Sequence, residues 1–145
     1  MTDSELLSIS TGISDNELKD ILGKARKIAV VGLSPKEQRD SNRVARYLLE
    51  KGYDIVPVNP GQREILGKKC YKSLSDIPGQ IDIVNIFLNP SRIPPAVDQA
   101  INSGVEVVWM QLGVVDNKSA EKARNEGIRV VMDRCIKLEY ERLMT

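Results

Sequence analysis

The chain has 145 residues, of which 41% are hydrophobic, and its 21 Lys and Arg residues against 20 Asp and Glu residues give a net charge of +1. This length suits a single domain spanning residues 1–145, and the balanced charge provides no overall field for nucleic acid or an anionic membrane. The sequence has no His, which excludes a Ser-His-Asp triad and any His-ligated metal, and its two Cys residues form no zinc motif. We therefore expect no metal site.

The N-terminal stretch MTDSELLSIS lacks the basic start and apolar run of a signal peptide, and no later apolar stretch is as long as a membrane span. We expect residues 1–13 to be a loosely ordered extension, and the protein to be cytoplasmic. The next stretch, SDNELKDILGKA, predicts an amphipathic helix that opens with a capping box formed by Ser14 and Glu17.

Short runs rich in Val and Ile then alternate with helical patterns along the chain. These runs are apolar at nearly every position, which is typical of strands buried on both faces of a parallel sheet. They are KIAVVG (27–32), YDIVPVN (53–59), IDIVNIF (81–87), VEVVWMQ (105–111) and IRVVMD (128–133), with GKKCY (67–71) as a further edge strand. Helices are predicted between them and at the C-terminal CIKLEYERL, and Gly52, Gly104 and Gly127 are placed as left-handed helix ends.

This alternation predicts a Rossmann-like, doubly wound α/β fold: a mainly parallel sheet of five to six strands with helices on both faces. With KIAVVG as the first strand, we expect the strand order 3-2-1-4-5, with the flavodoxin-like order as the alternative. In either case ligands are expected beyond the carboxyl ends of the strands.

The loop that follows the first strand, GLSPKEQRDS, is longer than a strand-to-helix connection needs to be. Gly32 ends the strand, and Ser41 is well placed to be the N-cap of the next helix. A helix N-terminus attracts anions, and Lys36, Arg39 and Arg43 add positive charge around it. The loop therefore indicates a phosphate site; the alternative is a solvated surface loop with an ordinary cap.

The two common nucleotide signatures fit this sequence poorly. After Gly32 come Leu33, Ser34 and Pro35, so the glycine-rich dinucleotide fingerprint is missing. The second strand ends at Val58 and Asn59 without the carboxylate that an NAD ribose needs, and no Walker A pattern occurs.

The stretches IAVVGLSPKEQRDSNRVARYLLEKGYDIVPVNPG, ILGKKCYKSLSDIPGQIDIVNIF, WMQLGV and VVMDRCIKLEYERL resemble the small stand-alone CoA-binding proteins, a family similar to the CoA-binding domain of the succinyl-CoA synthetase alpha subunit. The resemblance runs from about residue 16 to residue 143. It implies a Rossmann-type fold that binds coenzyme A or an acyl-CoA at its switch point, with no established reaction. The phosphorylated His of the synthetase is missing here, so ligase chemistry is not implied.

Carried over by position, the resemblance implies four groups of cofactor-binding residues. This sequence departs from the family at Leu88, where many relatives carry Arg, which puts in doubt any role that needs a cation there. The residues are Gly32, Leu33, Ser34, Arg39, Ser41 and Arg43 in the phosphate loop; Val58, Asn59 and Pro60 in the turn after the second strand; Leu88, Asn89 and Pro90 in the turn after IDIVNIF; and Met110, Gln111 and Gly113 in a fourth contact region.

Cys135 is the one candidate reactive group, since it follows a strand and starts a helix, where the dipole lowers a thiol pKa. One interpretation of Cys135 is a redox role toward the pantetheine end of the ligand; the alternative is a small buried apolar residue.

Three functional hypotheses remain open. The first is a CoA carrier, sensor or regulatory module without catalysis of its own, and the lack of an obvious base, nucleophile pair or metal site favours it. The second is the CoA-binding component of a CoA-ligase or acyltransferase completed by a partner protein. The third is a nicotinamide or nucleotide binder. None involves a nucleic acid or a membrane.

Overall fold

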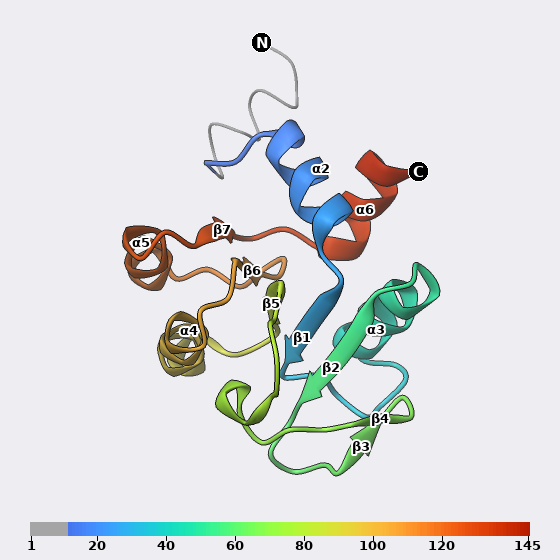
Figure 1. Ribbon diagram of the computed structural model, residues 1–145. Helices are drawn as coiled ribbons and strands as arrows, with labels where there is room; N and C mark the ends of the chain where they lie inside the picture. Colours follow the sequence, from blue (N-terminus) through green and yellow to red (C-terminus); the bar gives the residue numbers. More distant parts are fainter. Residues whose placement is uncertain (1–11) are drawn as a thin grey trace.

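The computed structural model describes residues 12–145 and consists of a parallel sheet between two layers of helices (Figure 1). The strands are β1 (Lys27–Val31), β2 (Asp54–Val58), β5 (Ile83–Ile86), β6 (Val107–Met110) and β7 (Arg129–Val131), in the order β2-β1-β5-β6-β7. Every neighbouring pair is parallel, as the apolar runs predict.

The strand order needs one refinement. Numbered along the chain, the five strands read 2-1-3-4-5, which is the flavodoxin-like alternative. Tyr71, however, forms a parallel bridge with Val58, on the side of β2 that faces away from β1. If this single bridge is counted as a strand, the order begins 3-2-1, as in the Rossmann-like expectation. The GKKCY run thus contributes only this bridge and β4 (Lys68–Lys69), which pairs antiparallel with β3 (Glu64–Ile65) in a separate small hairpin.

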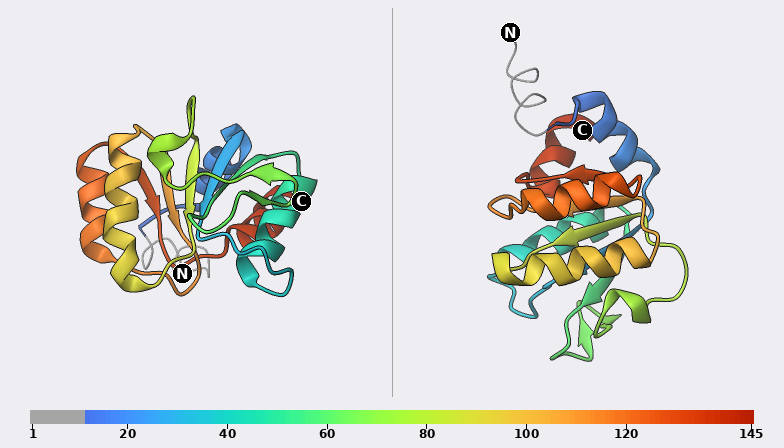
Figure 2. Two further views of the ribbon diagram at one scale, coloured as in Figure 1. Left: turned by 90° about the horizontal axis from the view of Figure 1, so that it is seen from below. Right: turned by 90° about the vertical axis from the view of Figure 1, so that its left-hand side faces the viewer.

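Successive strand residues pack on opposite faces of the sheet, and each face has its own core. On one face α4 (Ile93–Asn102), α5 (Asn117–Asn125) and the short helix η1 (Leu74–Asp76) cover residues such as Val31, Val58 and Ile86. On the other face α2 (Asp15–Lys24), α3 (Asp40–Glu50) and α6 (Ile136–Met144) cover residues such as Val30 and Trp109 (Figure 2). The doubly wound fold is therefore confirmed.

The ends of the helices follow the predicted signals. Ser14 caps α2, with its Oγ accepting a hydrogen bond of 3.2 Å from the N–H of Glu17. Gly52, Gly104 and Gly127 have φ angles of 93°, 68° and 81°, the left-handed conformation expected where these helices give way to strands.

Most of the expected loose extension, residues 1–11, lies outside the described residues. Ile13 within it is only 4% exposed and belongs to the core. No helix within residues 12–145 combines the length and apolar character needed to cross a bilayer.

Candidate functional site

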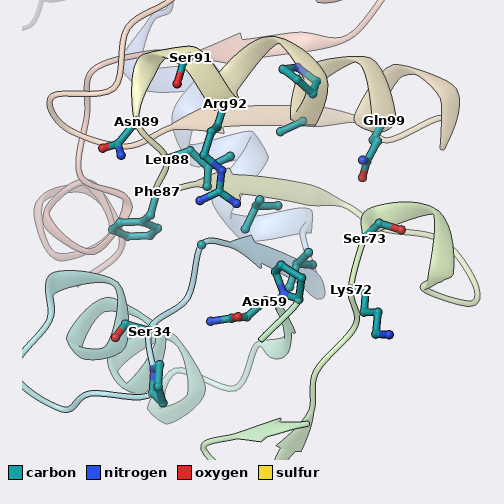
Figure 3. Close-up of a pocket in the computed structure, with 17 residues that line it drawn as sticks. Ser34, Asn59, Lys72, Ser73, Phe87, Leu88, Asn89, Ser91, Arg92 and Gln99 are labelled. Carbon is teal, nitrogen blue, oxygen red and sulfur yellow. The ribbon is translucent and has the colours of Figure 1, made fainter. Parts of the chain in front are cut away.

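Two adjoining hollows lie beyond the carboxyl ends of β1, β2 and β5. The larger, here called the main cleft, has a volume of about 510 Å³ (Figure 3). The smaller, here called the loop hollow, has about 400 Å³ and shares Gly32, Ser34 and Phe87 with the main cleft. β1 lies between β2 and β5, and the strand order reverses at this point along the chain. The edge beyond these three strands is therefore the switch point of the sheet.

Gly32 lies between the two hollows, at a position that only a glycine can occupy. Its φ is 86°, and a Cβ atom added there would lie 2.2 Å from the carbonyl oxygen of Phe87. A side chain is therefore excluded by both backbone conformation and space. The glycine lets the loop after β1 turn sharply against the end of β5.

Side chains of α3 hold the loop of residues 33–39 in place. The N–H of Ser34 donates to Oγ of Ser41 at 3.0 Å, and Nδ2 of Asn42 donates to the carbonyl of Ser34 at 2.8 Å. The prediction that Ser41 is the N-cap is wrong: α3 begins at Asp40, with Arg39 in the cap position. Ser41 lies two residues past the cap position, and its hydroxyl accepts from the loop instead, while still lining the loop hollow.

The two candidate arginines of this loop differ in their surroundings. Arg39 lines the loop hollow together with Lys36. Arg43 lines neither hollow: its guanidinium pairs with Asp40 and donates to the carbonyl of Gln38 at 2.7 Å. Arg43 is thus placed to brace the loop, and its phosphate contact stays a prediction that this geometry does not favour.

The turn after β2 lies where the sequence places it. Val58, Asn59 and Pro60 all line the main cleft. Nδ2 of Asn59 donates to the carbonyl of Leu33 at 3.0 Å, so this turn also supports the phosphate loop. Leu33 itself is fully buried and contributes its backbone rather than its side chain.

The turn after β5 forms the opposite wall. Leu88 and Asn89 line the main cleft, whereas Pro90 starts the short helix η2 (Pro90–Arg92) and does not. Sequence reasoning missed several residues that line the cleft further along the connections that follow β2 and β5: Lys72, Ser73, Ser91, Arg92, Pro95, Ala96 and Gln99. The available signal was a cation four residues after Leu88, on the first turn that follows a strand's carboxyl end.

The group after β6 lies apart from both hollows. Met110 is fully buried, and Gln111 is 5% exposed. Oε1 of Gln111 accepts from Nδ2 of Asn85 and from the N–H of Ile136, each at 3.3 Å, which ties β5, β6 and α6 together. The N–H of Gly113 donates to Asp133 at 2.7 Å. These contacts give the group a structural role, and a ligand contact for it stays a prediction.

Cys135 starts α6 as predicted and is half-buried against the core. It lines neither hollow. Its proposed redox chemistry therefore remains a prediction. Burial raises the pKa of the other thiol, Cys70, with a smaller contribution from Glu64 in the same direction.

The charge of the site has one sign. Lys36 and Arg39 line the loop hollow, and Lys72 and Arg92 line the main cleft. None of the described residues that line either hollow is an Asp or a Glu. Such a surface attracts phosphate groups, and it does so locally, since the whole chain carries a charge of only +1.

An open parallel α/β sheet with a cationic cleft at its switch point is the architecture of the Rossmann-like class, whose members commonly bind phosphorylated ligands at this place. A family model described as a CoA binding domain matches residues 26–141. The chain therefore belongs to the CoA-binding domain family, as the sequence resemblance indicates.

Individual relatives include small proteins of similar length and one longer ligase. The chain is 39% identical to the uncharacterized protein YneT of Bacillus subtilis over 88% of this chain and 94% of that one. A hypothetical protein from Pyrococcus horikoshii has a solved structure with a TM-score of 0.90 and 45% identity, over 92% of this chain and 94% of that one. The acetate–CoA ligase (ADP-forming) I of Archaeoglobus fulgidus is 28% identical over 75% of this chain, but the match spans only 17% of that ligase.

Proposed function

We propose that this protein binds coenzyme A or an acyl-CoA in the main cleft and loop hollow, and acts as a CoA carrier, sensor or regulatory module without catalysis of its own. The observation that carries the proposal is the pair of joined hollows at the switch point, lined by four cations and by no described carboxylate. Membership of the CoA-binding domain family supports the choice of CoA among phosphorylated ligands.

The site also argues against the nicotinamide hypothesis. An NAD site needs an acidic residue after the second strand to bind the ribose hydroxyls. Here that turn offers Asn59 and Pro60, and Asn59 already donates to the phosphate loop. No carboxylate of residues 12–145 lines the main cleft at that point.

Isothermal calorimetry against CoA, acetyl-CoA, NAD and ATP tests the proposal. We expect CoA or acetyl-CoA to bind most tightly, and to raise the melting temperature most at matched concentration. A ligand at 100 times its Kd adds about 2.7 kcal/mol to the free energy of unfolding, which is enough for a clear shift. Tighter binding of NAD or ATP, or no binding of CoA, would overturn it. The ratio of the CoA and acetyl-CoA affinities shows whether an acyl group is recognised.

A role as the CoA-binding component of a ligase is the second candidate. The observation that favours it is the match to an ADP-forming acetate–CoA ligase, in which the matched region is a small part of a longer protein. The test is CoA-dependent release of ADP from ATP and acetate by the chain isolated from its own host with any bound partner. Activity that disappears with Arg39→Gln supports this role, and a chain that is isolated alone and is inactive contradicts it.

A further inference from the structure

The cations of the site form two separate pairs. Lys36 and Arg39 lie on the loop after β1, whereas Arg92 lies on the first turn after β5, and Lys72 lies between β4 and η1. The two hollows share only backbone and neutral side chains, among them Gly32, Ser34 and Phe87. A ligand that carries two separate anionic groups can satisfy both pairs at once.

Arg92 has no structural reason to be a cation. Its guanidinium makes no hydrogen bond or ion pair with any residue of 12–145, and it extends into the main cleft on the side facing Asn59 (Figure 3). It occupies the cap position of α4, where the helix dipole disfavours positive charge. Lys72 lies at the rim of the same cleft and is likewise free of partners within the described chain. An anion bound in the cleft would neutralise the unpaired charges of both side chains.

The surface between these cations is neutral. Val31, Val58, Leu88 and Pro95 supply apolar area, and the carboxamide of Gln99 supplies polar atoms, with its Oε1 accepting from the N–H of Leu74 at 3.1 Å. Apolar walls with a few polar groups suit a flat heterocycle. The main cleft therefore suits a nucleoside that carries a phosphate, and the loop hollow suits the phosphates that continue from it.

We propose that Arg92, assisted by Lys72, binds the 3′-phosphate of coenzyme A and makes the protein distinguish CoA from dephospho-CoA. This inference rests on the proposed function. CoA carries a 5′-diphosphate and, apart from it, a 3′-monophosphate on the same ribose, so it has one anionic group for each cation pair. NAD lacks the isolated monophosphate, and the phosphates of ATP form one continuous chain.

Calorimetry with CoA and dephospho-CoA tests the assignment on the wild type, Arg92→Gln and Lys72→Gln. Wild type should prefer CoA by about 10- to 100-fold, the range expected for a charge-assisted hydrogen bond. Arg92→Gln should lose most of this preference while keeping its affinity for dephospho-CoA within about twofold. Lys72→Gln should lose a smaller part. Arg39→Gln, in the loop hollow, should weaken both ligands alike and leave the preference intact.

Matched controls are Arg124→Gln and Lys118→Gln, which change exposed cations of α5 outside both hollows and should leave both affinities unchanged. Arg92→Lys keeps a cation and should retain part of the preference. This variant therefore separates the effect of losing the charge from the effect of disturbing the fold. If wild type binds CoA but Arg92→Gln keeps the full preference, or weakens both ligands equally, the assignment of Arg92 is wrong and the proposed function stands. If wild type binds neither ligand, both the assignment of Arg92 and the proposed function are wrong.

Discussion

Arg39 and Arg43 lie about one helical turn apart, yet only one of them faces the site. Arg39 lines the loop hollow without a partner in the described chain, whereas Arg43 is held by Asp40 and the carbonyl of Gln38. We expect Arg39→Gln to weaken CoA binding by about 1.5–3 kcal/mol, the scale of a charge-assisted hydrogen bond. Arg43→Gln should weaken CoA binding by only about 0.5–1 kcal/mol, because it removes an exposed ion pair that holds the loop and no ligand contact. Calorimetry of the pair measures both, and the reverse ranking would make Arg43 the phosphate ligand.

Gly32 permits a second comparison between single residues. Gly32→Ala should destabilise the protein by at least about 1–2 kcal/mol, because a left-handed φ is strained for Ala and its Cβ would collide with backbone at Phe87. The control is Gly61→Ala, in the turn after β2, where φ is not left-handed and the nearest atom is 3.5 Å away. Urea unfolding of both variants measures the difference. Equal stabilities would show that the loop adapts without cost.

At the scale of elements, Tyr53 joins α2 to the start of β2. Its hydroxyl donates to the carbonyl of Leu22 at 2.5 Å, and burial raises the pKa of this phenol to about 12. Because the pKa is raised on folding, the neutral phenol stabilises the protein fully below pH 10, its ordinary pKa. This contribution is lost as the pH rises toward about 12.

The free energy of unfolding of wild type should therefore exceed that of Tyr53→Phe by about 1 kcal/mol at neutral pH, the value of one hydrogen bond. The gap should shrink between pH 10 and about 12 and then reverse. Denaturant melts of the two proteins across this range give the difference directly, so that other titrating groups cancel. A gap that stays constant to pH 12 would mean that the phenol ionises without disturbing the fold.

The long elements were predictable because their burial pattern is continuous in the sequence. The runs that became β1, β2, β5, β6 and β7 are short, rich in Val and Ile and apolar at nearly every position, which is typical of a sheet covered on both faces. The hairpin β3–β4 has two residues in each strand and no such pattern, so the sequence of GKKCY predicts a single edge strand instead. The start of α3 was misplaced because a Ser near a helix start resembles a cap whether its hydroxyl serves the helix or the loop.

The site was predictable where it depends on strand ends and not where it depends on side-chain direction. Asn59 directly follows β2, and Leu88 and Asn89 come soon after the end of β5 at Ile86, so the topology alone brings them to one edge. Arg92 and Lys72 lie further along their connections, so only the folded chain shows that they reach the same cleft. Gln111 also follows a strand, but its side chain is bound by Asn85 and Ile136, which no pattern in the sequence reveals.

For the molecule as a whole, the charge of the cleft contrasts with the near-neutral chain. CoA binding should weaken as salt rises from about 10 mM to about 0.3 M, because screening shortens the reach of the four cations from roughly 30 Å to well under 10 Å. A variant that combines Arg39→Gln and Arg92→Gln should bind weakly with a much flatter salt dependence. Calorimetry at several salt concentrations checks this. A wild-type affinity that does not respond to salt would mean that apolar contacts, rather than the cations, dominate binding.

The parallel sheet also determines the stage of folding at which the main cleft can form. Ile28 of β1 pairs with Ile83 of β5, so the two walls of the main cleft are joined only after the whole intervening chain has been arranged. Closing such long connections costs entropy before any contact compensates, so we expect this pairing to form late on the folding pathway. A newly made chain therefore has no ligand site until β5 has emerged and docked. CoA would then act mainly on the finished molecule, and prolong its life by slowing unfolding rather than by hastening folding.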